Sequence, residues 1–316
     1  MSLWDRIKKN AFLYFATKFL MLLLIVFILD FTIGHVLRYY FYKQECGRQY
    51  RAIYAIDKTK ADILIFGSST AYHHYVPPVI AKRLNETCYN MGSPGQGILF
   101  EYAVLKAVLK RYTPKLIILD VNLREFKSGK DYYDRLSFLL PFYKDHEEIR
   151  PIVDLKSPLE KYKLWSSIYA YNSSFLIIAG GNSEYFKKRN SDIDGYKPLT
   201  RVWDKPIREF DWNKYQFDTV KINMFKTFID DCRNAGTKLV IVSSPRYIKF
   251  REREESYAMM DDIARNRKVD VLDFVNDTSF TNHPEYFDDD AHLNSQGAEF
   301  FTNVVLNRLD SLKLTK

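Results

Sequence analysis

The sequence predicts an α/β protein whose core is a doubly wound parallel sheet of five strands, sandwiched by helices. Apolar runs of strand length alternate along the chain with segments whose apolar residues recur at helical spacing. One run, "KLIILDVN", is apolar almost throughout, as a strand buried on both faces should be. The 316 residues are 47% hydrophobic and 16% aromatic, which is ample for a packed core and argues against disorder.

Five strands are expected in this sheet, and their positions indicate where a site can form. They are Asp62–Phe66, Cys88–Gly92, Lys115–Asn122, Lys238–Ser244 and Val269–Phe274. Strands that alternate with helices are typical of a flavodoxin-like sandwich, in which ligands bind outside the carboxyl ends of the strands. Ser69 and Asn122 both follow strand ends, so both are expected on that functional edge.

The helices between and after these strands are also visible as patterns. They are Pro77–Asn85, Gly97–Tyr112, Thr219–Asn234, about Glu252–Arg265 and Ser295–Leu312. Residues 127–217 do not alternate cleanly and are rich in Tyr, Trp and Lys. We interpret them as an insertion over the functional edge, within one domain that spans residues 44–316.

Residues 1–43 are expected to form an N-terminal tail and a transmembrane signal-anchor. The uninterrupted apolar core, Phe19–Leu29, is 11 residues long, below the ~20 that a spanning helix needs. Including Phe12–Thr17 reaches that length, with the Lys18 ammonium extended back toward the interface. No small-x-small cleavage site follows, which favours an uncleaved anchor over a removed signal peptide. A buried amphipathic helix is the alternative.

Charges on either side of this segment indicate its orientation. Arg6, Lys8 and Lys9 precede it, whereas Arg38 and Lys43 follow it, so the positive-inside rule favours a cytoplasmic N-terminus. Long downstream domains are translocated readily, and residues 44–316 are therefore expected outside the cytoplasm.

The net charge of +8 and the three cysteines exclude several classes of protein. Lys and Arg are scattered and often lie beside acids, as in "FREREES", without a basic stripe or a nucleic-acid motif. No nucleic-acid partner is expected, although a modest attraction to anionic membranes remains. Cys46, Cys88 and Cys232 form no CxxC motif and have no His at metal-ligand spacing, which argues against a zinc site or a disulfide scaffold.

Two distant stretches carry candidate catalytic chemistry. "ILIFGSST" ends a strand at Ser69, and "YFDDDAHLNSQGAEFF" places Asp289 and His292 three residues apart, just before a helix. A serine hydroxyl is a weak nucleophile that needs an adjacent imidazole to take its proton, and the imidazole needs a carboxylate to orient it. On the serines alone, Ser68 and Ser69 as caps of the turn would be the simpler interpretation. The distant Asp-x-x-His pair favours a nucleophile.

In these motifs the chain resembles the SGNH/GDSL hydrolase family, particularly membrane-anchored bacterial members related to surface-polysaccharide acyltransferases. "FGSS" matches the first block, with Ser69 as nucleophile and Ser68 where the family usually has Asp. "NMGSPG" matches the second block and implies that the backbone N–H of Gly95 lines an oxyanion hole. "DDAHLNSQGA" matches the last block.

The third block departs from the family pattern. Members commonly have Gly-x-Asn-Asp, whereas this chain has "LDVNLREF", without the Gly and the following Asp. The resemblance implies oxyanion donors at the backbone N–H groups of Ser69 and Gly95 and at the Asn122 side-chain amide. Asp120 facing the site instead is the alternative.

The resemblance implies a membrane-anchored serine esterase or O-acyltransferase, with no cofactor and no metal. It would act on ester groups, most simply O-acetyl groups, of a cell-envelope glycan or another acylated small molecule, at the outer side of the bacterial cytoplasmic membrane. A membrane protein that donates acyl groups is a further expected partner. The alternatives are a catalytically inactive relative that binds glycan or scaffolds an export complex, and a metal-dependent phosphoesterase that would use the acidic loop Asp288–Asp290.

Four further residues are candidates for substrate binding. His73 and His74 are expected to line the cleft or shield the turn at Ser69. Arg124 and Arg246 follow strand ends, where they would contact an anionic substrate or the acyl group. Surface ion pairs are the alternative role for both arginines.

Overall fold

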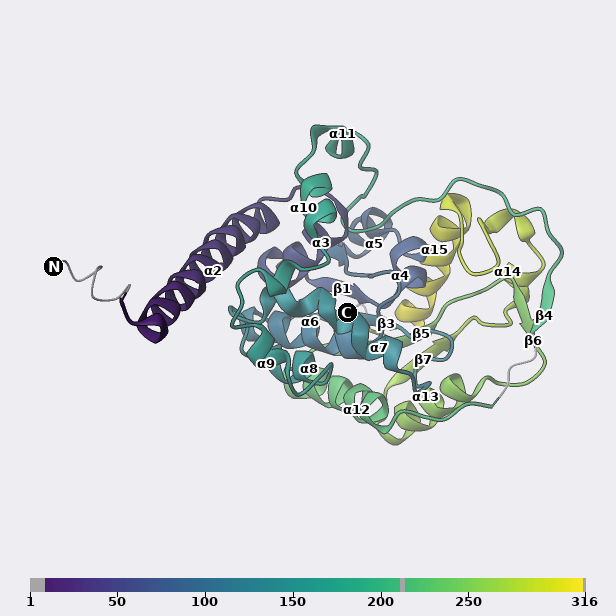
Figure 1. Cartoon of the computed structure of the whole chain (residues 1–316). Helices are drawn as coiled ribbons and strands as arrows, with labels where there is room; N and C mark the ends of the chain where they lie inside the picture. The colour runs from purple at the N-terminus through teal and green to yellow at the C-terminus, as the bar shows by residue number, and fades with distance from the viewer. Residues whose placement is uncertain (1–8, 211–213, 315–316) are drawn as a thin grey trace.

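The structure, a computed structural model, describes residues 9–210 and 214–314 (Figure 1). Its core is a five-stranded sheet in the order β2-β1-β3-β5-β7, in which every neighbouring pair is parallel. The strands are β1 (Ile63–Phe66), β2 (Cys88–Asn90), β3 (Leu116–Asp120), β5 (Lys238–Ser243) and β7 (Asp270–Asp273). The predicted doubly wound α/β fold is confirmed, because the chain leaves β1 first toward one edge of the sheet and then builds toward the other.

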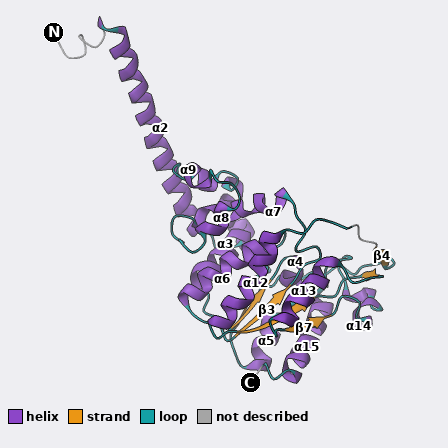
Figure 2. Cartoon of the chain, turned by 90° about the horizontal axis from the view of Figure 1, so that it is seen from below, coloured by secondary structure: helices purple, strands orange, loops and turns teal. Residues whose placement is uncertain are grey.

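Five helices cover the two faces of the sheet (Figure 2). They are α5 (Pro77–Leu84), α6 (Ile98–Arg111), α12 (Thr219–Asn234), α13 (Glu255–Asn266) and α15 (Ser295–Ser311). Leu64 and Phe66 of β1 lie in the hydrophobic core shared with α6, α12 and α13. Ile63 and Ile65 lie in the second core, shared with α5 and α15. Burial on both faces explains why β1 and β3 are continuously apolar in sequence.

The predicted elements are present, with small shifts at their ends. Helix α12 has the predicted bounds, whereas α13 begins at Glu255, later than the pattern suggested, because the Glu254 carboxylate caps it by accepting the N–H groups of Ser256 and Tyr257. The pattern did not indicate α4 (Ser69–His74), which is too short to show helical periodicity. Short helical elements also precede β1 and α15: they are α3 (Gly47–Ile53), η1 (Tyr54–Lys58), α14 (Thr278–Thr281) and η4 (Pro284–Tyr286).

The segment before α12 is a series of short elements. They are α7 (Lys130–Asp134), η2 (Arg135–Phe142), α8 (Arg150–Asp154), α9 (Glu160–Lys163), η3 (Tyr169–Tyr171), α10 (Phe175–Gly181), α11 (Glu184–Lys187) and β4 (Arg208–Phe210). Strand β4 pairs in parallel with β6 (Ile248–Phe250), apart from the main sheet. The division of the chain at residues 43, 127 and 217 stays a prediction.

Helix α2 (Ala11–Tyr42) projects from the rest of the chain (Figure 2). By length and composition it is apolar enough to cross a membrane, and helices of signal sequences share these properties. It joins the globular part at Asp30, whose carboxylate accepts hydrogen bonds from the Ser166 hydroxyl at 2.5 Å and the Ser167 N–H at 2.7 Å. Gly34 packs so closely on Ser167 that a Cβ there would lie 2.3 Å from the Ser167 Cβ. Arg6 and Lys8, on which the predicted orientation depends, lie outside the described residues.

Candidate active site

The turn after β1 places Ser69 at the carboxyl edge of the sheet. The register pairs Phe66 of β1 with Leu119 of β3, which brings Gly67 beside Asp120. Gly67 has φ +141°, and a Cβ there would lie 2.7 Å from the Asp120 carbonyl oxygen, so this turn requires glycine. Ser69 follows as the first residue of α4, with its side chain partly accessible.

Ser69, His292 and Asp289 form a continuous chain of hydrogen bonds. His292 Nε2 lies 2.8 Å from the Ser69 hydroxyl, and His292 Nδ1 lies 2.9 and 3.0 Å from the two Asp289 carboxylate oxygens. Burial alone would raise the pKa of Asp289, but its hydrogen bonds and the charge of His292 lower it to about 2. Asp289 is therefore ionised at neutral pH and holds the imidazole proton on Nδ1, which leaves Nε2 free to accept the Ser69 proton.

The two other histidines near Ser69 are neutral and have different surroundings. His74 is fully buried, and its Nε2 accepts the Leu293 N–H at 3.0 Å. This ring has no exposed surface in the structure and holds the loop that carries His292; its expected contact with substrate stays a prediction. Burial lowers the pKa of His73 to about 4, and its Nδ1 lies 2.8 Å from the Lys197 carbonyl oxygen. Its expected contact with substrate stays a prediction.

A buried carboxylate supports the turn from below. Asp120 is 1% exposed and accepts hydrogen bonds from Thr70 at 2.8 Å, from Tyr75 at 2.7 Å and from the Ser244 hydroxyl. Burial raises the pKa of Asp120 to about 6, although the three hydroxyl donors oppose this shift. Asp120, at the end of β3, thus links α4, which begins at Ser69, to the end of β5.

The loop after β2 carries the expected oxyanion donor, Gly95. Its N–H donates to the Ser68 hydroxyl at 3.0 Å, and its carbonyl oxygen accepts from Arg135 at 2.5 Å. Gly95 has φ +76°, a left-handed conformation that glycine adopts without strain. Its N–H therefore points to the turn that carries Ser69, and in this conformation the Ser68 hydroxyl occupies it.

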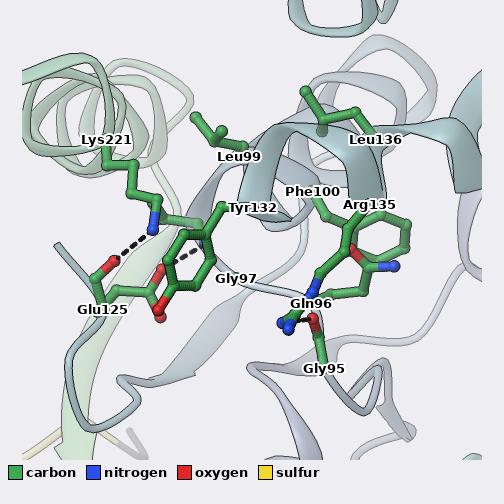
Figure 3. A pocket seen from close by; sticks show the side chains of 11 residues that line it. Gly95, Gln96, Gly97, Leu99, Phe100, Glu125, Tyr132, Arg135, Leu136 and Lys221 are labelled. Carbon is green, nitrogen blue, oxygen red and sulfur yellow. Dashed lines mark hydrogen bonds between the residues drawn. The ribbon is translucent and has the colours of Figure 1, made fainter. Parts of the chain in front are cut away.

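Asn122 lies in the loop after β3, where it engages a buried acid. The Asn122 carbonyl oxygen accepts the Glu125 N–H at 3.2 Å, and the Glu125 carboxylate accepts the Ile98 N–H at 2.8 Å at the start of α6. Gly97 leaves room for this acid, because a Cβ there would lie 2.6 Å from Glu125 Oε1 (Figure 3). Glu125 thus connects the loop of Asn122 with the loop of Gly95. The role of Asn122 as an oxyanion donor stays a prediction.

Sequence reasoning missed the charged residues around this contact. Lys221 is 2% exposed, and its ammonium donates to the carbonyl oxygens of Glu125 and Lys127 at 3.0 Å each, over the ring of Tyr132 (Figure 3). Burial lowers the pKa of Lys221 to about 8, and burial raises the pKa of Glu125 and, further, that of Glu101. Of these residues, only Glu125, the acid in "LREF", stands out in the sequence as a charge beside a strand end. Lys221 gave no such sign, because a lysine within a helical pattern normally lies on the solvated face.

Arg124 and Arg246 both lie near the carboxyl edge. Arg124 has φ +59° and stacks over the Phe210 ring, with 5.2 Å between guanidinium carbon and ring centre. Arg246 lies beside Tyr257 and stabilises the charged form of Asp120. Within residues 9–210 and 214–314, neither guanidinium makes an ion pair with a carboxylate. Their expected contact with an anionic group stays a prediction.

The three consecutive acids of the last loop point to different partners. Asp288 pairs with Arg201 at 3.3 Å, Asp289 contacts His292, and Asp290 pairs with Arg208. In the described part of the chain, no group of three or more His, Cys, Asp or Glu side chains is arranged to hold a metal ion.

The fold and the site together define a doubly wound α/β protein in which a serine, a histidine and a carboxylate are hydrogen-bonded in series at the carboxyl edge of the sheet. No family model matches the chain, and no curated protein matches it. Two solved structures are similar at low identity. A proposed acylhydrolase from Bacteroides fragilis NCTC 9343 shares 11% identity over 84% of this chain and 96% of that chain, with a TM-score of 0.40. A two-domain esterase active on acetylated mannans shares 13% identity over 80% of this chain, with a TM-score of 0.38. This chain spans 49% of that esterase, about half its length.

Proposed function

We propose that this protein is a serine esterase or O-acyltransferase that uses Ser69 as nucleophile, His292 as general base and acid, and Asp289 as the group that orients the imidazole. The hydrogen-bond chain from the Ser69 hydroxyl through His292 to Asp289 is the observation that carries this proposal. A hydroxyl within 2.8 Å of an imidazole whose other nitrogen faces an ionised carboxylate is the arrangement that activates serine.

The reaction proceeds in two halves. Ser69 Oγ attacks the ester carbonyl carbon while its proton passes to His292 Nε2, and a tetrahedral oxyanion forms. The intermediate collapses, His292 gives the proton to the leaving alkoxide, and the acyl group stays on Ser69. Water or a sugar hydroxyl then attacks the acyl-enzyme and loses its proton to His292, and the second collapse returns that proton to Ser69. Water as acceptor gives an esterase, and a sugar hydroxyl gives an acyltransferase.

The oxyanion would be bound by the backbone N–H groups of Ser69 and Gly95 and by the Asn122 amide. For this, the Gly95 N–H must turn from the Ser68 hydroxyl, which it now contacts at 3.0 Å, to the substrate oxygen. Each such donor is worth on the order of 10²–10³-fold in kcat in enzymes of this mechanism.

We infer that α2 anchors the protein in the bacterial cytoplasmic membrane, with the remaining domain on the outer side. The 19 residues Ala11–Leu29 precede the first contact with the globular part. At ~1.5 Å per residue they span about 28 Å, close to the hydrocarbon thickness of a bilayer. Trp165, which is 80% exposed, directly precedes Ser166, which binds Asp30. Tyr162, which is 50% exposed, packs edge-on against the Trp165 ring with 5.7 Å between ring centres, so both rings would meet the headgroup region.

We propose O-acetyl groups of a cell-envelope glycan as the substrate and a membrane protein as the source of acyl groups for transfer. The resemblance of the three sequence blocks to surface-polysaccharide acyltransferases is the support for this part. The test mixes the purified full chain, in neutral detergent, with an acetylated oligosaccharide as donor. A second, unacetylated oligosaccharide is added as acceptor.

The test follows the acetyl group. The wild-type protein is expected to release acetate or to move acetyl groups onto the second oligosaccharide, detected by mass spectrometry, whereas Ser69→Ala does neither. The ratio of the two products distinguishes esterase from transferase. A folded wild-type protein that leaves every acetylated oligosaccharide and a simple aryl acetate intact would contradict the proposal.

The second candidate is a non-catalytic glycan-binding or scaffold protein. The observation that favours it is the occupied state of one expected oxyanion donor, because the Gly95 N–H donates to the Ser68 hydroxyl at 3.0 Å. Saturable binding of a glycan without acetyl release or serine labelling would support this candidate instead.

A further inference from the structure

A polar cavity adjoins the loop of Gly95. It has a volume of about 400 Å³ and lies between α3, the loop after β2, η2, η3 and α10. Gln96 and Arg135 are among its lining residues. Gln96 follows Gly95 in the chain, and the Arg135 guanidinium donates to the Gly95 carbonyl oxygen (Figure 3). The cavity therefore borders the residue that follows Gly95, whose N–H is the expected oxyanion donor.

Two guanidinium groups line this cavity without an acidic partner. Arg48 donates to the Pro94 carbonyl oxygen at 2.8 Å and stacks over the Phe138 ring, and Arg135 donates to the Gly95 carbonyl oxygen at 2.5 Å. In the described ranges, neither forms an ion pair with a carboxylate. Elsewhere on this chain arginines near acids do so: Arg38, Arg83 and Arg267, for example, each pair with an aspartate.

The placement of these two positive charges is unfavourable without an anion. Desolvation and the nearby charges of Arg51 and Arg135 lower the pKa of Arg48. Lys156 adds a third cationic group, an ammonium, to the lining, but it pairs with the Glu160 carboxylate at 3.0 Å. An anionic group between Arg48 and Arg135 would relieve their repulsion and accept hydrogen bonds from both.

The rest of the lining suits a sugar. Asn172, Ser173 and Ser174 supply hydroxyl and amide groups, and Tyr169 supplies an aromatic ring. We propose that this cavity binds an anionic substituent, a carboxylate or a phosphate, of the glycan whose ester reaches Ser69, so that the enzyme acts on an acidic glycan. This inference rests on the proposed function, because the cavity is assigned to the same substrate.

Direct binding tests the inference without catalysis. Full-length Ser69→Ala protein in neutral detergent is titrated calorimetrically with oligosaccharides of two uronic acids and with a phosphorylated oligosaccharide, each beside its neutral counterpart (methyl ester or dephosphorylated). At least one acidic member is expected to bind tenfold or more tightly than its neutral counterpart, and to lose this advantage as NaCl rises from about 50 to 500 mM. The oligosaccharide that binds most tightly, uronic or phosphorylated, identifies whether the bound anionic group is a carboxylate or a phosphate.

The substitution Arg48→Gln, in the same Ser69→Ala background, is expected to reduce the acidic preference at least fivefold. The matched control is Arg308→Gln, at an exposed position on α15, which should keep it. Equal affinity for acidic and neutral members throughout the panel overturns the inference, and so does an acidic preference that survives Arg48→Gln unchanged. The salt titration keeps the test valid if Arg48→Gln does not fold.

Failure of this inference is distinguishable from failure of the proposed function. Labelling of wild-type Ser69 by a fluorophosphonate reports the activated serine and does not depend on the cavity. A labelled serine without acidic preference retains the proposed function and overturns the inference. Acidic preference without labelling retains the binding site and overturns the catalytic proposal.

Discussion

Two aspartates lie close to the turn that carries Ser69, and they differ in burial, in hydrogen-bond partners and in the direction of their pKa shifts. Asp289 is partly exposed, is bonded to His292 and two backbone N–H groups, and has a pKa lowered to about 2. Asp120 is buried, is bonded to three hydroxyl groups, and has a pKa that burial raises to about 6. The first carboxylate therefore acts on the imidazole next to Ser69, whereas the second holds together the strands and the helix beneath it.

This difference shows that proximity to a nucleophile does not define a catalytic role. Asp120 lies directly against the turn that carries Ser69, since a Cβ on Gly67 would lie 2.7 Å from its carbonyl oxygen. Only Asp289, however, contacts the group that contacts Ser69. The following variants separate an orienting carboxylate from a structural one.

The largest effect is expected for His292→Ala. Among the described residues, no other side chain is hydrogen-bonded to the Ser69 hydroxyl and could take its proton, so kcat for an aryl acetate should fall by about 10⁴–10⁶-fold. Steady-state hydrolysis by the full chain in detergent measures it. His73→Ala is the control at a neighbouring imidazole, with an expected loss of less than about tenfold. Comparable losses in the two variants would remove His292 from its proposed role.

The next effect is expected for Asp289→Asn, with a loss in kcat of about 10⁴-fold. An amide in place of the carboxylate donates to Nδ1 and so places the imidazole proton on Nε2, where it faces Ser69. Circular dichroism confirms the fold, and the same hydrolysis assay gives the rate. A loss of less than tenfold would mean that Asp289 does not set the tautomer.

Asp120→Asn is expected to change stability with pH more than it changes rate. The folded pKa of about 6 lies above the ordinary value of 3.8, so between these values the native state keeps a proton that the unfolded state has lost. Wild-type stability relative to the variant should therefore fall by about 2 kcal/mol as pH rises from 4 to 7. Asp289 has the opposite sign: its contribution is present above pH ~4 and is lost as pH falls toward 2.

Urea unfolding of the wild-type protein and Asp120→Asn at pH 4, 5, 6 and 7 measures this difference. A difference that is constant across the series would show that Asp120 does not titrate in this window. Hydrolysis by the same variant should stay within about 10²-fold of wild type, because Asp120 contacts Thr70 and Tyr75 rather than His292.

The smallest effect is expected for Ser68→Ala. This change removes the hydroxyl that accepts the Gly95 N–H, and a hydrogen bond of this kind is worth about 1 kcal/mol. The freed N–H should bind the oxyanion more readily and raise kcat by up to about fivefold. Ser311→Ala, at the end of α15, is the control. A tenfold fall in kcat would mean that Ser68 positions the Gly95 loop instead of competing for it.

Much of this fold was predictable from sequence because burial on both faces makes the central strands continuously apolar. Ser69, Asp289 and His292 could be named because short motifs place them after a strand and before a helix. Helix α4 could not, since six residues carry no periodic signal. The burial of His74 could not be predicted, because closeness in sequence to Ser69 says nothing about the direction of its ring.

Other features depend on contacts between distant segments. Glu125 and Lys221 are charged residues that became buried because α12 packs beside the loop after β3, and no local pattern records this. Arg48 and Arg135 come together only when α3 and η2 meet at the loop of Gly95. Whether an arginine has an acidic partner is decided only in the folded chain, so the proposed anion-binding cavity could not be derived from sequence.

The central claim, that Ser69 is activated by His292 and Asp289, is tested most directly by serine labelling. Full-length protein in neutral detergent is treated with a fluorophosphonate, and the adduct is followed by intact mass and located by peptide mapping. One adduct is expected, on Ser69; it should form in the wild-type protein and in Asp120→Asn, be absent from Ser69→Ala, and form at least 10³-fold more slowly in His292→Ala. A folded wild-type protein without an adduct, or an adduct that forms at the wild-type rate in His292→Ala, would contradict the central claim.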